Sequence, residues 1–327
     1  MTLNAVSNVR LLEKDFAIDH LSKIYVENTS RCNLKCKMCL LNTLQEGTGL
    51  MPLALFEELL DQLAAFPQMP TIHFAGYGEP TSHPDFVAML RAAKAAGARI
   101  GITTNGTLLT AELARELVAL QVDHLVVSID GVQPEHYQDI RLGSHLEDVI
   151  ANMMTLRRAK LRGVGHHSLP KVGIAFVAMK RNIADLALLP HLAARIGADE
   201  IIVSNVIPHT REMEGEILYE QALQKRLMPR ATISLPRMDV TLETGAVLQQ
   251  LSTSHMSLAM LDAQLTERTN YCRFIEEGYS VVRWDGAVSP CLAFMHEHVE
   301  YQKGYPRKVH HYAVGNIREQ RFAELWQ

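Results

Sequence analysis

The chain has 327 residues and a formal charge of −4, with 47% apolar and 21% charged residues. This composition is that of an ordinary globular protein, and the length suits one large domain with a smaller one. The weak negative charge argues against nucleic acid as a partner, because nucleic-acid binding needs a basic face. No signal-type segment and no apolar run of bilayer-spanning length occurs, so we expect no membrane contact and a cytoplasmic, reducing compartment.

From residue 22 to residue 206, short β-rich runs alternate with longer segments of helical period. The runs predict strands at Lys23–Glu27, Thr71–Ala75, Arg99–Thr103, His124–Ile129, Val172–Val177 and Glu200–Ser204. The periodic segments predict helices at Ala54–Ala65, Pro84–Ala96, Ala111–Leu120, Leu146–Leu161 and Ile183–Ile196. This alternation indicates parallel β–α units, either in an open doubly wound sheet or in a barrel. In both folds the functional residues collect at the carboxyl ends of the strands.

The regular alternation stops after Pro208. We expect a helical connecting segment next, with helices at Glu212–Leu227 and Met256–Leu265, and then short strands and turns. The predicted domains are a lead-in over residues 1–21, a core over 22–210, the helical connecting segment over 211–268 and a C-terminal extension over 269–327.

Three of the five cysteines, Cys32, Cys36 and Cys39, follow the first predicted strand with the spacing C-x3-C-x2-C. Clustered thiolates form a soft metal site that suits iron–sulfur clusters, zinc or copper(I). Structural zinc is usually closed by four ligands, and no fourth ligand lies at the corresponding spacing. Three cysteines on an iron–sulfur cubane would leave one iron open. The spacing therefore favours a cluster with a free coordination position, and structural zinc remains the alternative.

Polar residues and glycines also follow the later predicted strands. These candidates are Gly76, Gly78 and Glu79 after the second strand, Asn105 after the third, Ser128 and Asp130 at the fourth, and Asn182 after the fifth. Glycine lets the backbone approach a ligand closely, and a carboxylate there could bind an ammonium group. Turn and cap chemistry would explain each residue singly. A single site assembled from several loops explains why they all occur at strand ends.

These motifs together resemble the radical S-adenosylmethionine (SAM) enzymes, whose hallmark is C-x3-C-x2-C in the loop after the first strand. The resemblance implies an α/β fold, a partial (β/α)6 TIM barrel with a small C-terminal α+β extension. It also implies a [4Fe–4S] cluster on Cys32, Cys36 and Cys39, with SAM on the open iron. Met38 occupies the position before the last cysteine, which is usually aromatic or apolar in the family.

The resemblance assigns the second motif to the methionyl amine of SAM. A Gly-Gly-Glu type motif binds this amine in the family, and here Glu79 matches the acid and Gly78 the second glycine. Tyr77 intervenes before Gly76, which departs from the family pattern. The carboxylate is therefore the better-matched part of this motif.

The remaining strand-end residues resemble stretches of the peptide-modifying members of the family. There, Thr-Asn-Gly and Ser-x-Asp-Gly stretches stand where this chain has Asn105, Ser128 and Asp130. The serine and a downstream arginine help hold the SAM carboxylate, and Arg141 fits that arginine. Asn182 could bond the nucleoside, with a helix N-cap as the equally simple interpretation.

The C-terminal part contains Cys272 and Cys291, with Gly286 between them in the spacing C-x13-G-x4-C. Distant cysteines are ordinarily buried apolar residues. The spacing resembles the opening of the SPASM/Twitch extension, which carries auxiliary iron–sulfur clusters and normally supplies further cysteines downstream. None follows here, so the resemblance implies a truncated chain or an auxiliary site that is incomplete or lost. His296 and His298 could complete it, and a polar loop is the other interpretation of these histidines.

The nearest likeness is to the radical SAM maturases associated with tungsten-cofactor oxidoreductases. It rests on Arg141–Gly143, Phe176–Met179, Val203–Pro208, Tyr271–Gly278, Arg283–Gly286 and Val314–Ile317. It implies reductive cleavage of SAM to a 5′-deoxyadenosyl radical, which takes hydrogen from a substrate in cofactor, peptide or protein maturation. The implied partners are an electron donor such as flavodoxin or ferredoxin, and a tungsten oxidoreductase or a precursor peptide. A zinc-binding structural or regulatory protein and a non-radical barrel lyase are the alternatives.

Overall fold

The computed structural model describes residues 21–44, 46–162, 169–218, 232–235, 238–252, 257–260, 272–302 and 304–326. Nearly all of the predicted lead-in and most of the predicted helix Glu212–Leu227 lie outside these ranges. The centre of the fold is a sheet of eleven strands in the order β13-β10-β9-β1-β2-β3-β4-β5-β6-β7-β8. A separate two-stranded sheet pairs β11 with β12.

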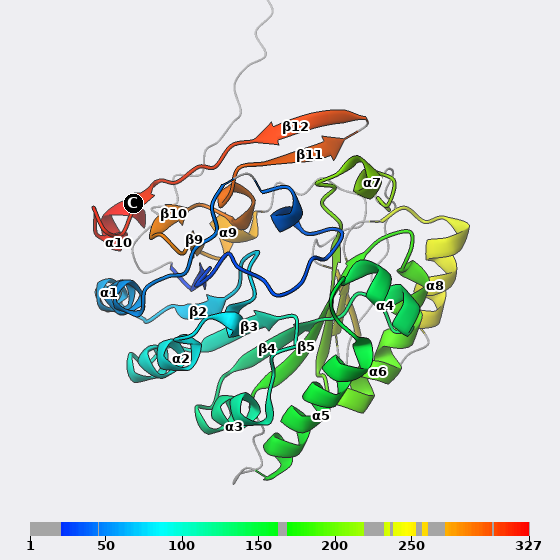
Figure 1. Ribbon diagram of the computed structural model, residues 1–327, viewed down its shortest axis with the longest axis horizontal. Helices are drawn as coiled ribbons and strands as arrows, with labels where there is room; N and C mark the ends of the chain where they lie inside the picture. The colour runs from blue at the N-terminus through cyan, green and yellow to red at the C-terminus, as the bar shows by residue number, and fades with distance from the viewer. Residues whose placement is uncertain are drawn as a thin grey trace, which may run out of the picture.

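Eight strands pair parallel in chain order and form the main part of the sheet. They are β1 (Lys23–Val26), β2 (Thr71–Phe74), β3 (Ile100–Thr104), β4 (His124–Ser128), β5 (Lys171–Ala178), β6 (Glu200–Asn205), β7 (Thr232–Leu235) and β8 (Ser257–Met260). The helices along the chain are α1 (Leu53–Leu63), α2 (Phe86–Ala95), α3 (Ala111–Ala119), α4 (Pro134–Ile140), α5 (Leu146–Arg162), α6 (Leu189–Ile196), α7 (Arg211–Glu214) and α8 (Leu242–Ser252). In Figure 1 the sheet curves, and α1, α2, α3, α5 and α6 lie along its outer side.

The two faces of the sheet differ because side chains alternate along each strand. Outward positions such as Ile24, Ile72 and Ile100 stand side by side in register and are fully buried in the core beneath the helices. Inward positions are polar or small, as His73 and Gly101 illustrate on adjacent strands. Burial of the apolar face fixes the register, which leaves a polar inner face for binding.

The predicted α/β class, with a mainly parallel sheet and a small C-terminal extension, is confirmed. All six predicted strands are present and begin and end within one residue of their expected limits. The expectation that 211–268 is a helical connection is wrong in part, because β7 and β8 continue the parallel sheet from this segment. The predicted helix Met256–Leu265 contains β8. A short apolar run fits a buried strand as well as a helix, and β7, which pairs with β6, offers the edge to which β8 hydrogen-bonds.

The C-terminal extension joins the same sheet on its other side. It comprises α9 (Arg273–Glu276), β9 (Tyr279–Val282), β10 (Ala287–Ser289), β11 (His298–Gln302), β12 (Tyr305–Val309), β13 (Gly315–Asn316) and α10 (Phe322–Trp326). Strand β9 pairs parallel with β1, and β10 turns back antiparallel to β9. The side chain of Gln62 on α1 bonds the backbone of both Ile317 and Phe322. The extension is therefore continuous with the barrel.

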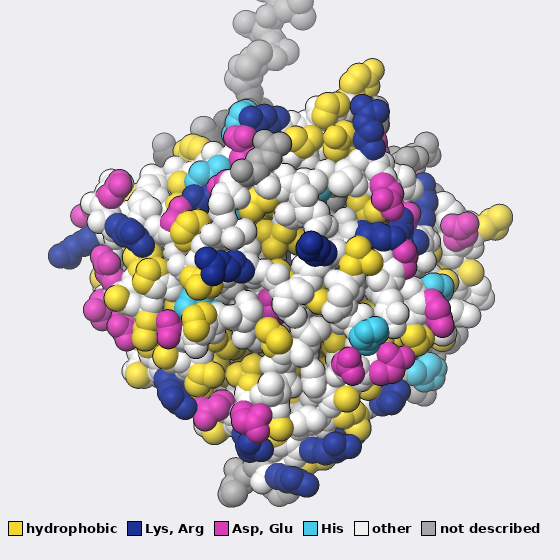
Figure 2. Space-filling view, in the orientation of Figure 1, with side chains coloured by type: hydrophobic (Ala, Val, Ile, Leu, Met, Phe, Trp, Pro, Cys, Tyr) yellow, Lys and Arg dark blue, Asp and Glu magenta, His cyan; other side chains and the backbone are white. Residues whose placement is uncertain are grey.

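The face seen in Figure 2 carries interspersed basic and acidic side chains, with the β11–β12 hairpin along its upper rim in Figure 1. Across the described ranges, no helix combines the length and the apolar character that crossing a bilayer requires.

Candidate active site

The loop after β1 carries Cys32, Cys36 and Cys39, and it is fixed by backbone hydrogen bonds. The N–H of Cys39 donates to the carbonyl of Cys36 at 2.9 Å, which closes a tight turn. The N–H of Lys37 donates to the carbonyl of Ile140 at 2.9 Å, and the N–H of Lys35 donates to the carbonyl of Leu142 at 3.1 Å. The cysteine loop is therefore held against the end of α4 and the residues after it.

The three thiols are free and close enough to influence one another. Burial raises the pKa of each, and that of Cys39 reaches about 12; ionised Cys36 and Cys32 add to this increase. Three thiolates here need a compensating cation, which a bound metal would provide. Within the described part of the chain, no three His, Cys, Asp or Glu side chains converge on one ion. Cysteine thiolates are the usual protein ligands of iron–sulfur clusters, so the donor set suits a cluster.

Glu79 follows β2 and is almost completely buried. Its Oε1 accepts hydrogen bonds from the hydroxyls of Thr81 and Thr104, both at 2.6 Å, and from the N–H of Thr81 at 3.1 Å. Among the described residues, its Oε2 accepts only the N–H of Asn105, at 2.7 Å. The carboxylate is therefore rigid, and Oε2 keeps lone-pair capacity for a further donor.

Gly76 and Gly78 pack against the chain that leads into the cysteine loop. A Cβ at Gly78 would overlap the carbonyl oxygen of Thr29, and one at Gly76 would lie 2.6 Å from Cγ of Glu27. Backbone on one side and a buried side chain on the other leave no room for a methyl group. These glycines therefore allow the second motif to lie directly on the loop after β1.

Asn105, after β3, reaches the cysteine loop directly. Its Nδ2 donates to Oδ1 of Asn33 at 2.9 Å and lies 3.9 Å from Sγ of Cys32. Ser128 ends β4 in a half-buried position, and its hydroxyl makes no hydrogen bond to any described residue. Asn105 thus joins the predicted thiol and carboxylate sites, whereas the Ser128 hydroxyl bonds to neither of them.

Asp130 and Arg141 form a buried ion pair next to the second cysteine. Nη2 of Arg141 lies 2.7 Å from Oδ2 of Asp130, and Nη1 lies 3.8 Å from Sγ of Cys36. Burial lowers the pKa of the arginine, but Asp130 and Cys36 outweigh burial and raise it overall. Nε of Arg141 is buried without a hydrogen-bond partner among the described residues. An orphaned buried donor of this kind suits a ligand with acceptor oxygens.

The last two predicted residues support this arrangement from its edge. Asn182 is fully buried, and its amide donates to the carbonyls of Asp130 and Val177, both at 2.9 Å. Its Oδ1 accepts the N–H of Met179 at 2.8 Å, so its amide hydrogens and its carbonyl oxygen are all engaged. Met38 packs on a small apolar cluster formed by Ile140, Met179, Val206, Met213 and Ile217.

A buried charge network beside the cysteine loop was not predicted. His296 is fully buried, with Nε2 2.9 Å from Oε2 of Glu27 and Nδ1 2.5 Å from Oε1 of Glu46. The ring of Tyr77 packs edge-on against His296, and the backbone N–H of Tyr77 donates to Oε1 of Glu27. The sequence signal that could have identified Glu27 as a functional residue is its position directly after the first strand. Nε2 of His298 lies 3.2 Å from Oε1 of Glu300, so both histidines contact carboxylates.

Cys272 and Cys291 lie in the extension, before α9 and before a single 3-10 turn respectively. Cys272 is exposed and Cys291 half-buried. Burial raises the pKa of Cys291, and ionised Cys272 would raise it further.

Comparison with known proteins agrees with this geometry. The family described as the Radical SAM superfamily matches residues 26–174, and the iron–sulfur cluster-binding domain SPASM matches residues 272–327. The chain is 35% identical over 304 residues to the tungsten-containing aldehyde ferredoxin oxidoreductase cofactor-modifying protein of Pyrococcus furiosus. That alignment covers 93% of this chain and 80% of the relative.

Two further likenesses are more partial. The mycofactocin maturase MftC of Mycobacterium tuberculosis is 30% identical over 172 residues, which cover 53% of this chain and 41% of MftC. SuiB of Streptococcus suis, solved with its precursor peptide SuiA, superposes with a TM-score of 0.65 at 17% identity. This superposition covers 94% of the chain but only 65% of SuiB, and it establishes the fold alone. By its motifs, its fold and its 35% identity to a relative covered over 80% of its length, the chain belongs to the radical SAM superfamily and is a radical SAM enzyme with a SPASM-type extension.

Proposed function

We propose that Cys32, Cys36 and Cys39 hold a [4Fe–4S] cluster and that SAM binds beside it. A cluster of this kind supplies one-electron cleavage of SAM to a 5′-deoxyadenosyl radical, which removes hydrogen from a substrate. The observation that carries the proposal is the convergence of polar groups from separate strands on the thiols. Asn105 reaches Cys32 and Arg141 reaches Cys36, at 3.9 and 3.8 Å.

The chain's own residues provide groups for both ends of the methionyl part of SAM. Oε2 of Glu79, with a single donor at present, would accept the amine. The unpartnered Nε of Arg141 would donate to the carboxylate, with the unbonded hydroxyl of Ser128 as a second donor. Asn105 would steady the cysteine loop, and Gly76 and Gly78 would let the second motif pack against it.

Other predicted residues act through these groups. Asp130 holds the guanidinium of Arg141, and Asn182 holds the carbonyl of Asp130. Since the amide of Asn182 is already bonded, we assign it a positioning role in place of nucleoside contact. Met38 closes the apolar side of the loop. We assign residues 22–210 to the radical SAM core, with the strands of 211–268 continuing it and 269–327 as the extension.

We further propose that the reaction serves the maturation of a cofactor, peptide or protein. The names of the tungsten cofactor-modifying relative and of the mycofactocin maturase support this class. A one-electron donor such as flavodoxin or ferredoxin would reduce the cluster in the cytoplasm. Cys272 and Cys291 would contribute two thiolates to a second iron–sulfur site in the extension, as the match over residues 272–327 suggests.

Anaerobic reconstitution of the full chain tests the central proposal. We expect iron and sulfide near four each at the first site, and 5′-deoxyadenosine from SAM when dithionite is supplied. Cys36→Ala should lose that iron and the product. Lys35→Ala, which removes an exposed side chain from the same loop, is the matched control and should keep both.

Two outcomes would overturn the proposal in favour of the alternatives. Stoichiometric zinc without iron after anaerobic purification would indicate a zinc-binding structural protein. Iron that is retained without any 5′-deoxyadenosine, under conditions where SAM binds, would indicate a barrel enzyme of another reaction class.

A further inference from the structure

The opposite end of the barrel from the cysteine loop contains a cavity of about 460 Å³. It lies where β1 to β6 begin, and residues at the starts of these six consecutive strands line it. The cysteine loop and the other predicted site residues follow the carboxyl ends of the same strands. The cavity therefore belongs to neither the cluster site nor the SAM site.

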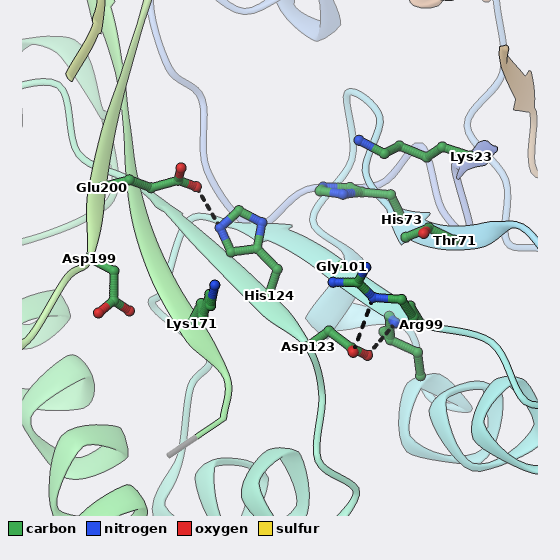
Figure 3. A pocket seen from close by; sticks show the side chains of 11 residues that line it. Lys23, Thr71, His73, Arg99, Gly101, Asp123, His124, Lys171, Asp199 and Glu200 are labelled. Carbon is green, nitrogen blue, oxygen red and sulfur yellow. Dashed lines mark hydrogen bonds and ion pairs between the residues drawn. The ribbon is translucent and has the colours of Figure 1, made fainter. Parts of the chain in front are cut away.

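Nitrogen-bearing side chains from five neighbouring strand starts point into this cavity. Figure 3 shows Lys23, His73, Arg99, His124 and Lys171 directed toward its middle. The ammonium of Lys23 lies 4.4 Å from the ring centre of Tyr279. In the described part of the chain, neither lysine forms an ion pair. The ammonium groups of Lys23 and Lys171 are therefore free to bind a ligand, whereas Nε of Arg99 lies 3.4 Å from Oδ1 of Asp123.

The carboxylates at the cavity wall are, by contrast, engaged with the protein. Oδ2 of Asp123 accepts from Nζ of Lys94 at 2.7 Å and from the N–H of Ile100 at 2.8 Å. Glu200 lies 2.6 Å from Nε2 of His124. Asp199 accepts the N–H of the residue after Lys171 at 2.9 Å, and Figure 3 shows its carboxylate directed away from the middle. Their charges are therefore partly offset before any ligand arrives.

Two glycines make room for the histidines on the inner face of the sheet. A Cβ at Gly101 would overlap Nδ1 of His73, and one at Gly173 would lie 3.3 Å from Nε2 of His124. Nε2 of His73 bonds the hydroxyl of Thr103 at 2.9 Å, which fixes the ring across β3. The histidines are consequently held in place at the cavity wall.

The pKa of Lys23 is lowered by burial and then by Arg273 and Arg99, although Glu277 and Glu200 act against this decrease. The pKa of His73 is lowered to about 3 by burial, and then by Lys23 and His124. A bound anion would oppose both decreases.

We propose that the cavity binds a small polyvalent oxyanion, namely a phosphate group that is free or carried by a small molecule. The ammonium groups of the two lysines and the guanidinium of Arg99 are suitable partners for phosphate oxygens. The volume of the cavity is that of a small-molecule pocket. Residues at the amino ends of barrel strands more often stabilise the fold than bind ligands. The experiment must therefore distinguish anion binding from a polar cluster with a purely structural role.

Calorimetry on the apo full chain provides the test, with inorganic phosphate, pyrophosphate and ADP as probes in chloride buffers of matched ionic strength. We expect saturable binding that weakens about tenfold in Lys171→Met and in Lys23→Met, since each loses one charge-assisted contact. Arg115→Met removes an equal charge from the exposed side of α3 and should leave affinity unchanged. Tighter binding of ADP than of pyrophosphate would identify a nucleotide, and equal binding a phosphate group alone.

Thermal unfolding supplies an independent readout, because a ligand that binds only the folded state raises Tm. The rise at a given phosphate concentration should be smaller in Lys171→Met, whose side chain is exposed and not needed for folding. No saturable binding, or equal affinity in the wild type and both lysine variants, would overturn the proposal. The test needs neither iron nor SAM, so its result is independent of the radical chemistry proposed above.

Discussion

His296 of the C-terminal extension lies with Nε2 3.0 and 2.9 Å from the two carboxylate oxygens of Glu27, at the end of β1. Its other ring nitrogen faces Glu46. Only the protonated ring can donate to carboxylates from both nitrogens, so the pair links the extension to the root of the cysteine loop through a buried charge. Glu27 in turn accepts the N–H of Tyr77, within the second motif.

This link predicts a stability that depends on pH. Burial lowers the pKa of His296, but Glu27 and Glu46 outweigh burial and raise it. A group whose pKa is raised by folding stabilises the protein fully below its unfolded value, and that stability is lost as pH rises through the folded value. We expect urea unfolding to show a loss of stability from about pH 6.5 upward. The loss should be smaller in His296→Gln, where His298, whose pKa Glu300 also raises, accounts for what remains, and it should be unchanged in His310→Gln, whose ring is exposed.

The same histidine predicts a large effect of its removal at lower pH. His296→Leu leaves Glu27 as an unpaired buried charge, which destabilises by about 3–5 kcal/mol. Urea unfolding at about pH 6 measures this difference. A loss below about 1 kcal/mol, as expected for an exposed pair, would contradict the buried imidazolium.

Arg141→Lys tests the SAM carboxylate site without removing the charge that faces Asp130. The lysine keeps the ion pair but loses the Nε donor, so SAM should bind about tenfold more weakly. Iron content should not change. Equilibrium binding of SAM to the reconstituted protein measures the effect, with Arg115→Lys as the control. Unchanged affinity would remove Arg141 from the SAM site.

Glu79→Gln separates the amine-binding role from the structural role of this side chain. The amide oxygen can still accept from the hydroxyl of Thr104, but the NH2 group cannot accept from the N–H of Asn105. The lost hydrogen bond lowers the stability of the fold by about 1–3 kcal/mol. We expect the cluster to form and SAM to bind more weakly. Glu79→Ala would strand more donors and is the poorer test. If SAM affinity in Glu79→Gln equals that of the wild type, the amine is bound elsewhere.

Gly78→Ala should disrupt the loop after β1, since the added methyl group overlaps the backbone carbonyl of Thr29. Backbone cannot rotate away as a side chain can, so we expect destabilisation of about 3 kcal/mol or more and reduced iron incorporation. Gly47→Ala, with open space at the Cβ position, is the matched control. Normal stability and iron content in Gly78→Ala would contradict the close packing.

The sequence predicted the local part of this molecule well. Short β-rich runs that alternate with segments of helical period located β1 to β6, and the polar residues after the strand ends pointed to Asn105, whereas the family resemblance implied Arg141. Periodicity could not decide Ser257–Met260, since a short apolar run fits either element. Nor could it pair Glu27 with His296, which are 269 positions apart and meet only because β9 returns to β1.

The pairing of β9 with β1 makes the barrel and the extension a single folding unit. Without residues 269–327, β1 would become an edge strand whose backbone groups face solvent next to the cysteine loop. Exposed edges of this kind recruit other chains, so the barrel produced alone should associate through β1. Activity studies on this enzyme therefore require the extension even where its own thiols take no part in the reaction.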